Sequence, residues 1–175
     1  DLGGNAMLGA LCNAVRRGVD VRVTVDSLGS ISGGSHSALR ALETCADDAG
    51  FMRNSEGQLT TKKARVQVVI FNAVTKLNSP NRRSHDKLLV KDGTFEGKSV
   101  MITGGRNISE DYYGIRGDGT PDPDPFRDAE ILIRGAENPT GESMTVGELS
   151  ESYSSILFLL HLNKRIKPVH NETND

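Results

Sequence analysis

The residues that could do chemistry lie in one stretch, residues 84–107, which reads SHDKLLVKDGTFEGKSVMITGGRN. His85, Lys87 and Asp92 follow one another as H-x-K-x-x-x-x-D, and Asn107 closes the tetrapeptide GGRN. Lysine supplies a point charge and three donors, and the asparagine amide supplies further donors. A neutral imidazole is a competent covalent nucleophile. Together these residue types suit a site for an anionic phosphate group.

A β-hairpin is predicted to position these side chains. Leu88–Val90 and Val100–Thr103 are apolar and rich in β-branched residues, and a turn of Gly, Asp and Thr separates them. Side chains at i and i+2 of a strand point the same way, so His85 and Lys87 are expected to share a face. The Gly-Gly pair before Arg106 permits close backbone approach at the end of the second strand. The alternative is that each side chain is an ordinary surface group, but four residue types at fixed spacing favour a common site.

The composition bounds the class of protein. With 175 residues, 36% hydrophobic and 25% charged, the chain is long enough for one compact, soluble domain. A dedicated nucleic-acid binder usually carries a basic surplus, whereas the formal net charge here is −2. Cys12 and Cys45 have no metal-ligand spacing and lie in helical patterns, which predicts buried free thiols. No apolar run reaches the length of a membrane span.

The periodicity of the whole chain predicts an α/β fold, a mixed sheet of about five strands flanked by helices. Besides the hairpin, the predicted strands are Val19–Asp26, Ala64–Phe71 and Phe126–Arg134, and the predicted helices are Asp1–Arg17, His36–Asp48 and Val146–Leu162. The polar segment Gly50–Lys63 is predicted to be irregular, and His36 to be a cap or surface residue. In Gly114–Pro125 the carboxylates match no calcium loop, so they are interpreted as turn residues.

The end of the chain gives two further expectations. Ile156–Leu160 are five consecutive large apolar residues, and a helix that is apolar all round packs on several sides. The helix Val146–Leu162 is therefore expected to contact a second lobe or a second copy of the chain. Residues 163–175 are polar and predict a linker or tail, so that residues 1–162 form the single lobe.

The motif residues resemble the HKD motif of the phospholipase D superfamily, H-x-K-x4-D followed by G-G/S-x-N. The segments RRSHDKLLVKDG and MITGGRNISEDYYG are most similar to the branch that contains the bacterial cardiolipin synthases, and NAMLGALCNAVRRGVDVRVTVDS resembles the helix and strand that precede the motif there. The resemblance covers Asn5–Leu160 and implies a phospholipase D-like lobe. It also implies phosphodiester hydrolysis or phosphatidyl transfer on phospholipids through a phosphohistidine.

The same resemblance implies a role for each site residue. His85 would attack phosphorus, and Lys87 and Asn107 would hold the non-bridging oxygens, with Gly104 and Gly105 beside the substrate. Asp92 would support the site without touching phosphate. Glu130, in the element Asp-Ala-Glu, would accept a hydrogen bond from His85 and fix its tautomer, or would be a solvent-exposed carboxylate. The chemistry requires no metal and no cofactor.

The partners follow from the count of motifs. In the superfamily two HKD motifs build one active site, and this chain holds one, so the second is expected from a homodimer copy or from a missing half of a longer polypeptide. A phospholipid substrate implies peripheral contact with a bacterial membrane. Two alternatives stay open: a homodimeric phospholipase D-like endonuclease acting on nucleic acid, and a non-catalytic phosphate-binding lobe. Arg82 and Arg83 are either a solvated pair or a basic rim that attracts an anionic head group.

Overall fold

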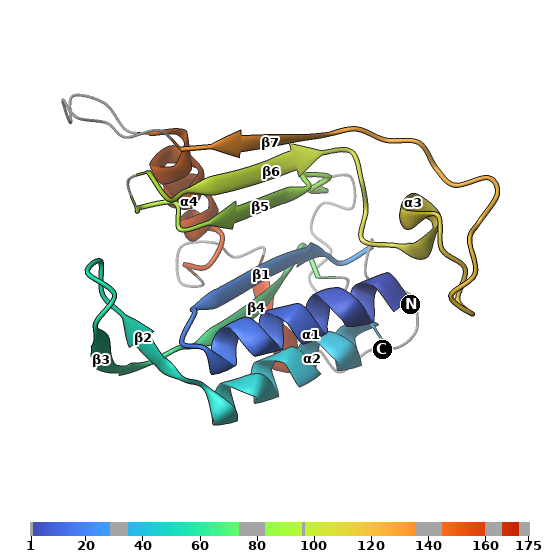
Figure 1. The fold of residues 1–175 in the computed structure, drawn as a ribbon. Coiled ribbons are helices and arrows are strands. Elements are labelled where there is room, and N and C mark those ends of the chain that lie inside the picture. Colours follow the sequence, from blue (N-terminus) through green and yellow to red (C-terminus); the bar gives the residue numbers. More distant parts are fainter. Residues whose placement is uncertain are drawn as a thin grey trace. The chain divides into compact units, whose positions relative to one another are not determined.

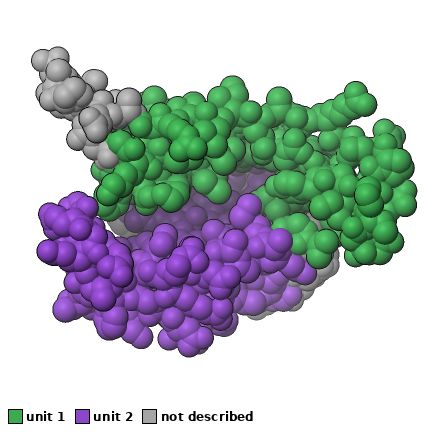
Figure 2. Space-filling model, in the orientation of Figure 1, with its two compact units in different colours: residues 1–4, 85–156 green, residues 5–84, 157–175 purple. Residues whose placement is uncertain are grey.

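The computed structural model describes residues 2–28, 35–73, 83–95, 97–135, 145–159 and 166–171. It has the expected α/β character, with helices and a mixed sheet. Where the sequence predicts one lobe, the structure divides into two compact units, coloured separately in Figure 2. Unit 1 comprises residues 1–4 and 85–156, and unit 2 comprises residues 5–84 and 157–175. Every predicted site residue lies in unit 1.

Unit 2 is built on a mixed three-stranded sheet. Its order is β1 (Val21–Asp26), β4 (Val66–Phe71) and β8 (Ile166–Pro168), with β1 parallel to β4 and β8 antiparallel to it. Helices α1 (Leu2–Arg16) and α2 (Ser35–Thr44) lie alongside β1 and β4 in Figure 1. The core of this unit contains Val15 of α1, Leu39 and Leu42 of α2, and Val68 and Ile70 of β4. The alternation of Val68 and Ile70 fits one sheet face covered by helices.

The sequence misses a second hairpin in unit 2. In the segment predicted to be irregular, β2 (Phe51–Arg53) pairs with the antiparallel β3 (Leu59–Lys63). The side-chain Oδ1 of Asn54 accepts from the Gln58 N–H at 2.8 Å, and the Asn54 N–H donates to the Gln58 carbonyl at 3.0 Å. The strand LTTKK is mostly polar and exposed, so it carries little of the apolar alternation on which strand prediction depends.

Part of the predicted tail belongs to the fold of unit 2. Strand β8 adds to β4, and Val169 in the short 3-10 helix η3 (Val169–Asn171) is fully buried. The few apolar residues of this stretch are surrounded by polar ones, so composition suggests a linker. Pairing with β4 is a contact between residues about 100 positions apart, which local pattern cannot show.

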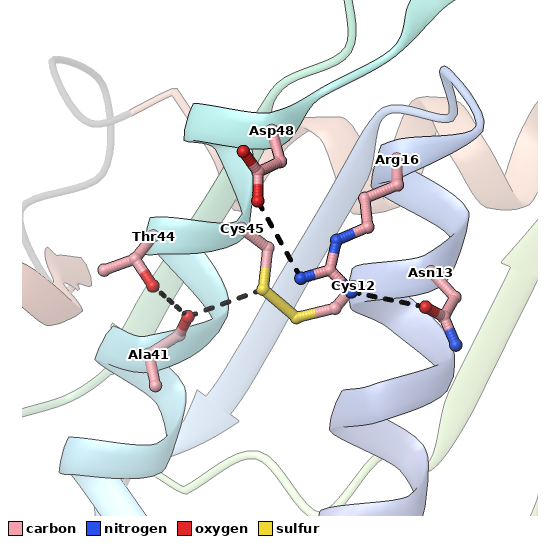
Figure 3. The surroundings of a disulfide bond; sticks show 7 residues. All are labelled: Cys12, Asn13, Arg16, Ala41, Thr44, Cys45 and Asp48. Atoms are coloured by element: carbon pink, nitrogen blue, oxygen red, sulfur yellow. Dashed lines mark hydrogen bonds and ion pairs between the residues drawn. A yellow bond between two sulfur atoms is a disulfide. The ribbon is translucent and has the colours of Figure 1, made fainter.

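The two cysteines correct another prediction, because Cys12 and Cys45 form a disulfide rather than remaining free thiols. Cys12 lies in α1, and Cys45 begins the 3-10 helix η1 (Cys45–Asp48) that continues α2 (Figure 3). Their Cα atoms are 5.5 Å apart, within the range that a disulfide spans. Arg16 and Asp48 form an exposed ion pair beside it at 4.0 Å. The helices were predicted correctly, but their packing side by side was not visible in sequence.

His36 also differs from expectation. It lies in the first turn of α2 and is 6% exposed, so it is a buried residue rather than a surface one. Its neighbour along the helix face, Leu39, belongs to the core. His36 is therefore one of the buried residues of this helix, together with Leu39 and Leu42.

Unit 1 is built on an antiparallel three-stranded sheet, β5 (Leu88–Lys91), β6 (Val100–Gly104) and β7 (Glu130–Arg134), with β6 in the middle (Figure 1). The predicted hairpin is confirmed. The five predicted strands all form, but they are distributed over the two units rather than joined in one sheet. The short helix α3 (Glu110–Tyr113) lies in the long connection from β6 to β7.

Helix α4 (Val146–Ile156) packs against β5 and the turn that follows it. It begins with a capping box, in which the Thr145 N–H donates to Glu148 Oε2 at 2.7 Å and the Glu148 N–H donates to Thr145 Oγ1 at 3.2 Å. It ends at Ile156, not at Leu162, so the apolar run does not continue it as one helix. Ile156 is 56% and Leu159 40% exposed, and Leu160 lies outside the described residues.

The acidic connection after α3 is confirmed as turn structure. The Thr120 hydroxyl and N–H donate to Asp118 Oδ1 at 2.6 and 2.9 Å, and these bonds lower the pKa of Asp118. Asp122 similarly accepts from the Asp124 N–H at 3.2 Å. Across the described residues no three His, Cys, Asp or Glu side chains are grouped to hold a metal ion. Nor does the described part of the chain contain a helix with the length and apolar character to cross a membrane.

Candidate functional site

The register of the unit 1 sheet brings the motif segments to one end. Leu88, the first residue of β5, pairs with Thr103 near the end of β6. Gly104, the last residue of β6, pairs with Glu130, the first residue of β7. Antiparallel strands alternate in direction, so β5 starts where β6 ends and β7 starts. The segments that carry His85 and Lys87, the GGRN tetrapeptide and Glu130 therefore meet at the same end of the sheet.

His85 and Lys87 lie in the segment just before β5. The His85 side chain is exposed, and its ring makes no hydrogen bond to any described residue. Lys87 is half-buried, and its Nζ donates to the His85 backbone carbonyl at 3.0 Å. An ammonium has three donors, so two remain for an anion. An exposed imidazole next to a held ammonium is an arrangement that an incoming phosphate can reach.

Asn107 follows β6 in an exposed position. Its amide Nδ2 donates to the hydroxyl of Tyr112, the third residue of α3, at 3.2 Å. The carboxamide has a second N–H, which no described residue accepts from. Asn107 can thus keep its orientation and still donate to an oxyanion.

Glu130 has a different partner from the one expected. Its Oε2 lies 3.3 Å from Arg106 Nε, and the described residues show no hydrogen bond between Glu130 and His85. The guanidinium of Arg106 also donates to the backbone carbonyls of Tyr112 and, at 3.3 Å, Asp128. In this arrangement Glu130 balances the charge of a structural arginine. Arg106 was not singled out from the sequence, although a charged residue between Gly105 and Asn107 was a visible signal.

Gly104 and Gly105 allow a close approach, but what approaches is the protein itself: the backbone at Gly104 and the Asp128 side chain at Gly105. A Cβ added at Gly104 would lie 2.3 Å from the Ala129 carbonyl oxygen and 2.9 Å from Glu130 Cα. One added at Gly105 would lie 2.4 Å from Asp128 Oδ1. The residues at the start of β7 therefore occupy the space that these glycines leave. Their packing role explains the Gly-Gly pair without a bound substrate.

Asp92 lies at the opposite end of the hairpin from His85. It follows Lys91, the last residue of β5, and forms an ion pair with it. Its backbone is left-handed, with φ of 52°, and its carbonyl accepts from the Phe95 N–H at 3.0 Å. The four residues of β5 span about 13 Å at 3.3 Å each, and this strand separates Asp92 from the end of the sheet that carries His85. The left-handed backbone of Asp92 and its hydrogen bond from Phe95 shape the turn at the far end of β5, and its supporting role in the site stays a prediction.

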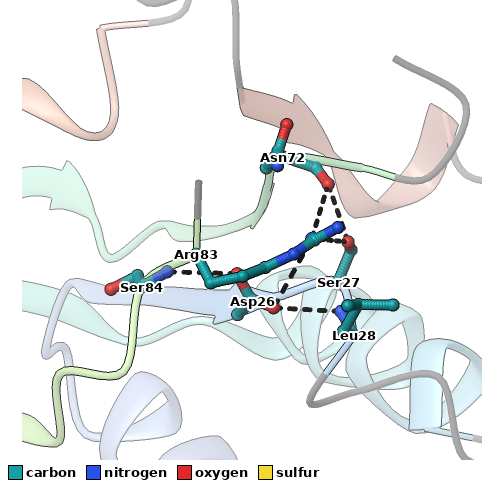
Figure 4. Close-up of polar contacts among 6 residues, drawn as sticks. All are labelled: Asp26, Ser27, Leu28, Asn72, Arg83 and Ser84. Atoms are coloured by element: carbon teal, nitrogen blue, oxygen red, sulfur yellow. Dashed lines mark hydrogen bonds and ion pairs between the residues drawn. The ribbon is translucent and has the colours of Figure 1, made fainter. Parts of the chain in front are cut away.

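Arg83 is neither a solvated residue nor an open basic rim. In unit 2 its Nη1 lies 3.7 Å from Asp26 Oδ1 and donates to the Ser27 hydroxyl at 3.0 Å and to the Asn72 carbonyl at 3.2 Å (Figure 4). Its side chain is 21% exposed, and the charge is compensated by the carboxylate. The Ser84 N–H also donates to Asp26, at 3.2 Å. Arg82 lies outside the described residues.

Comparison of the chain with models of protein families, with curated proteins and with solved structures finds no match.

Proposed function

We propose that the chain is one lobe of a phosphodiesterase or phosphatidyltransferase that acts on phospholipids through a phosphohistidine. The single observation that carries the proposal is the register of β5, β6 and β7, which gathers the segments of His85, Lys87 and Asn107 at one end of the sheet. The motif HDKLLVKDG…GGRN supplies the residue types. An exposed histidine, a half-buried lysine and an exposed asparagine in segments that meet at one sheet end support this proposal.

The proposed reaction has two steps. A ring nitrogen of His85 attacks phosphorus, so a P–N bond forms while the P–O bond to the leaving alcohol breaks. A general acid from a second motif gives that alcohol its proton. Water or an acceptor alcohol then attacks the phosphohistidine, loses a proton to the same group, and releases His85. Which of the two histidines attacks depends on the orientation of the substrate.

Electrostatic stabilisation comes from Lys87 and Asn107. Two ammonium donors and one amide donor face no other acceptor among the described residues, so they can bind the non-bridging oxygens as negative charge develops. Glu130 contributes through Arg106 in this arrangement, because its carboxylate pairs with that guanidinium. No metal ion enters the proposal.

A lipid phosphodiester is the proposed substrate, and a second HKD motif is the proposed partner. The net charge of −2 favours a lipid over the polyanionic backbone of a nucleic acid. This sequence supplies one motif histidine, so the active species would be a homodimer or a longer polypeptide that carries the second lobe in cis. A nuclease of the same chemistry would differ in substrate and not in the roles of His85, Lys87 and Asn107.

The test is to trap the covalent intermediate. The oligomeric state of the purified chain is first measured by light scattering. The chain is then incubated with vesicles of phosphatidylglycerol that carries labelled phosphate. The reaction is quenched in alkali, because phosphohistidine is stable there. We expect label on the wild-type dimer, none on His85→Ala, and wild-type label on the control His170→Gln, an exposed histidine of unit 2 paired with Glu43.

Three outcomes would contradict the proposal. Equal label on His85→Ala and wild type would remove His85 from the chemistry. Efficient turnover by a sample shown to be monomeric would contradict the need for two motifs. Cleavage of a single-stranded DNA oligonucleotide, with the vesicles left intact, would replace the lipid by a nucleic acid as substrate.

A further inference from the structure

We infer that Tyr112 is a positioning residue for Asn107, because its hydroxyl fixes the carboxamide that would bind the phosphate. This inference rests on the proposed function and extends it to a residue that does not belong to the motif. It starts from one contact, the hydrogen bond from Asn107 Nδ2 to the Tyr112 hydroxyl oxygen at 3.2 Å. Asn107 lies in the loop that connects β6 to α3, and Tyr112, five positions later, lies in α3.

Asn107 needs such a partner because its side chain is exposed and follows the end of a strand. An exposed carboxamide samples several rotamers and two amide orientations, and binding a phosphate would then require ordering it. The Tyr112 hydroxyl oxygen accepts a hydrogen bond from one of the two amide N–H groups. The remaining N–H keeps a defined direction for an anion. A fixed donor stabilises developing charge better than a mobile one, since no reorganisation is needed during the reaction.

Tyr112 is itself held from three sides. Its N–H donates to the Ser109 carbonyl at 3.0 Å, and its own carbonyl accepts from the Arg106 guanidinium. Its ring packs against Phe126, with centroids 5.2 Å apart and a tilt of 52°, a favourable aromatic geometry. The hydroxyl is therefore presented from a rigid position. A tyrosine on a mobile loop could not orient Asn107.

Arg106 connects this arrangement to the sheet. It lies between Gly105 and Asn107 in the sequence, and it links the Tyr112 carbonyl to the Glu130 carboxylate at the start of β7. The loop that carries Asn107 is thus held at its first residues by Arg106 and at α3 by Tyr112. Glu130 influences Asn107 by way of this arginine, without contacting the substrate.

The experiment compares two neighbouring tyrosines. Tyr112→Phe deletes the hydroxyl that contacts Asn107 and keeps the ring against Phe126. Tyr113→Phe is the matched control, because the Tyr113 hydroxyl makes no hydrogen bond to a described residue and its ring keeps the contact with Arg106, 5.7 Å from the guanidinium carbon. Each is combined with Asn107→Ala, and kcat and KM for phosphatidylglycerol are measured on the dimer.

We expect Tyr112→Phe to lower kcat by about threefold to tenfold with little change in KM, the size set by one neutral hydrogen bond. In the Asn107→Ala background the same change should have no further effect, because its route to the substrate is gone. Tyr113→Phe should match wild type. Equal kcat for the two tyrosine variants, or an undiminished effect of Tyr112→Phe without Asn107, would overturn the inference.

A second readout does not depend on turnover. In nitrogen-15 correlation spectra the Asn107 side-chain amide pair, assigned by its loss in Asn107→Ala, should shift in Tyr112→Phe and stay in place in Tyr113→Phe. An unshifted pair in both variants would overturn the inference whatever the activity. If the pair shifts but Asn107→Ala turns over like wild type, the proposed role of Asn107 has failed, and the positioning role fails with it.

Discussion

Replacing Gly104 by alanine tests whether the Gly-Gly pair serves packing or substrate. The φ angle of Gly104 is not in the left-handed region, so the backbone itself accepts alanine. The added Cβ would lie 2.3 Å from the Ala129 carbonyl oxygen and 2.9 Å from Glu130 Cα. Both are backbone atoms, which cannot rotate away as the end of a side chain can. Strand β7 must therefore shift relative to β6.

The magnitude follows from two opposing effects. Forcing an extra methyl group into a packed position costs about 1–3 kcal/mol. Alanine in place of glycine stabilises by about 0.4–1 kcal/mol, because the unfolded chain has less freedom. The net expectation is a loss of up to about 2.6 kcal/mol, centred on about 1.3 kcal/mol. Gly117→Ala is the control, since its Cβ would meet only Glu110 Oε2, at an ordinary 3.5 Å, and it should stabilise by about 0.4–1 kcal/mol.

The assay uses a probe that the sequence confines to unit 1. The chain has three tyrosines, Tyr112, Tyr113 and Tyr153, and no tryptophan, and all three lie in residues 85–156. Tyrosine fluorescence in a urea titration thus reports the unfolding of this unit, and the two glycine variants can be compared by their midpoints. If the Gly-Gly pair serves packing, Gly104→Ala should lower the urea midpoint and Gly117→Ala should raise it.

Two results would refute this account. If Gly104→Ala is as stable as wild type, the steric contact with β7 does not constrain the fold. If it is as stable as wild type but lacks the proposed phosphodiesterase activity, and wild type has that activity, the glycine serves the substrate, as the resemblance to the HKD motif implies.

Two further predictions concern unit 2. The Cys12–Cys45 disulfide closes a loop with a sequence separation of 33, so Cys12→Ser with Cys45→Ser should lower the unfolding free energy by about 3.7 kcal/mol in the chain-entropy estimate. In urea titrations followed by circular dichroism, reductant should lower the unfolding midpoint of wild type and leave that of the variant unchanged. If reductant does not change the wild-type midpoint, the disulfide is contradicted. Arg83→Gln should cost roughly 1.5–3 kcal/mol, because it removes the guanidinium that pairs with Asp26 in a mostly buried site. The more exposed pair of Arg65 with Asp20 is the control, and Arg65→Gln should cost less than about 1 kcal/mol. If the two substitutions lower the unfolding free energy equally, burial does not determine the strength of these ion pairs.

Local pattern predicted the elements of this protein well. Alternation of valine in VRVTVD and the apolar run of VQVVIF specify β1 and β4, and the spacing of apolar residues specifies α1 and α2. The hairpin β5–β6 follows from two β-branched segments around a Gly-containing turn. These signals are local, because each depends on residues that are neighbours in the chain. The polar strands β2 and β3 lack them and were missed.

Sequence also determined which chemistry to look for, through the residue types and spacing of His85, Lys87 and Asn107. Tertiary structure decided what holds them. The strand register brings their segments together, and it places Glu130 where it pairs with Arg106. The contact of Asn107 with Tyr112 depends on how α3 folds back after β6, which no spacing rule specifies.

Long-range pairings account for the remaining differences. The disulfide joins cysteines on two helices, β8 pairs with β4 across about 100 residues, and Arg83 pairs with Asp26 at the end of β1. Each of these residues has an ordinary local environment in sequence: two helical cysteines, a polar tail and a basic pair. The sequence by itself determined the elements and the residue types of the site, because these depend on neighbours along the chain. Only the tertiary structure decided the partners, because a partner is set by the packing of segments that are distant in sequence.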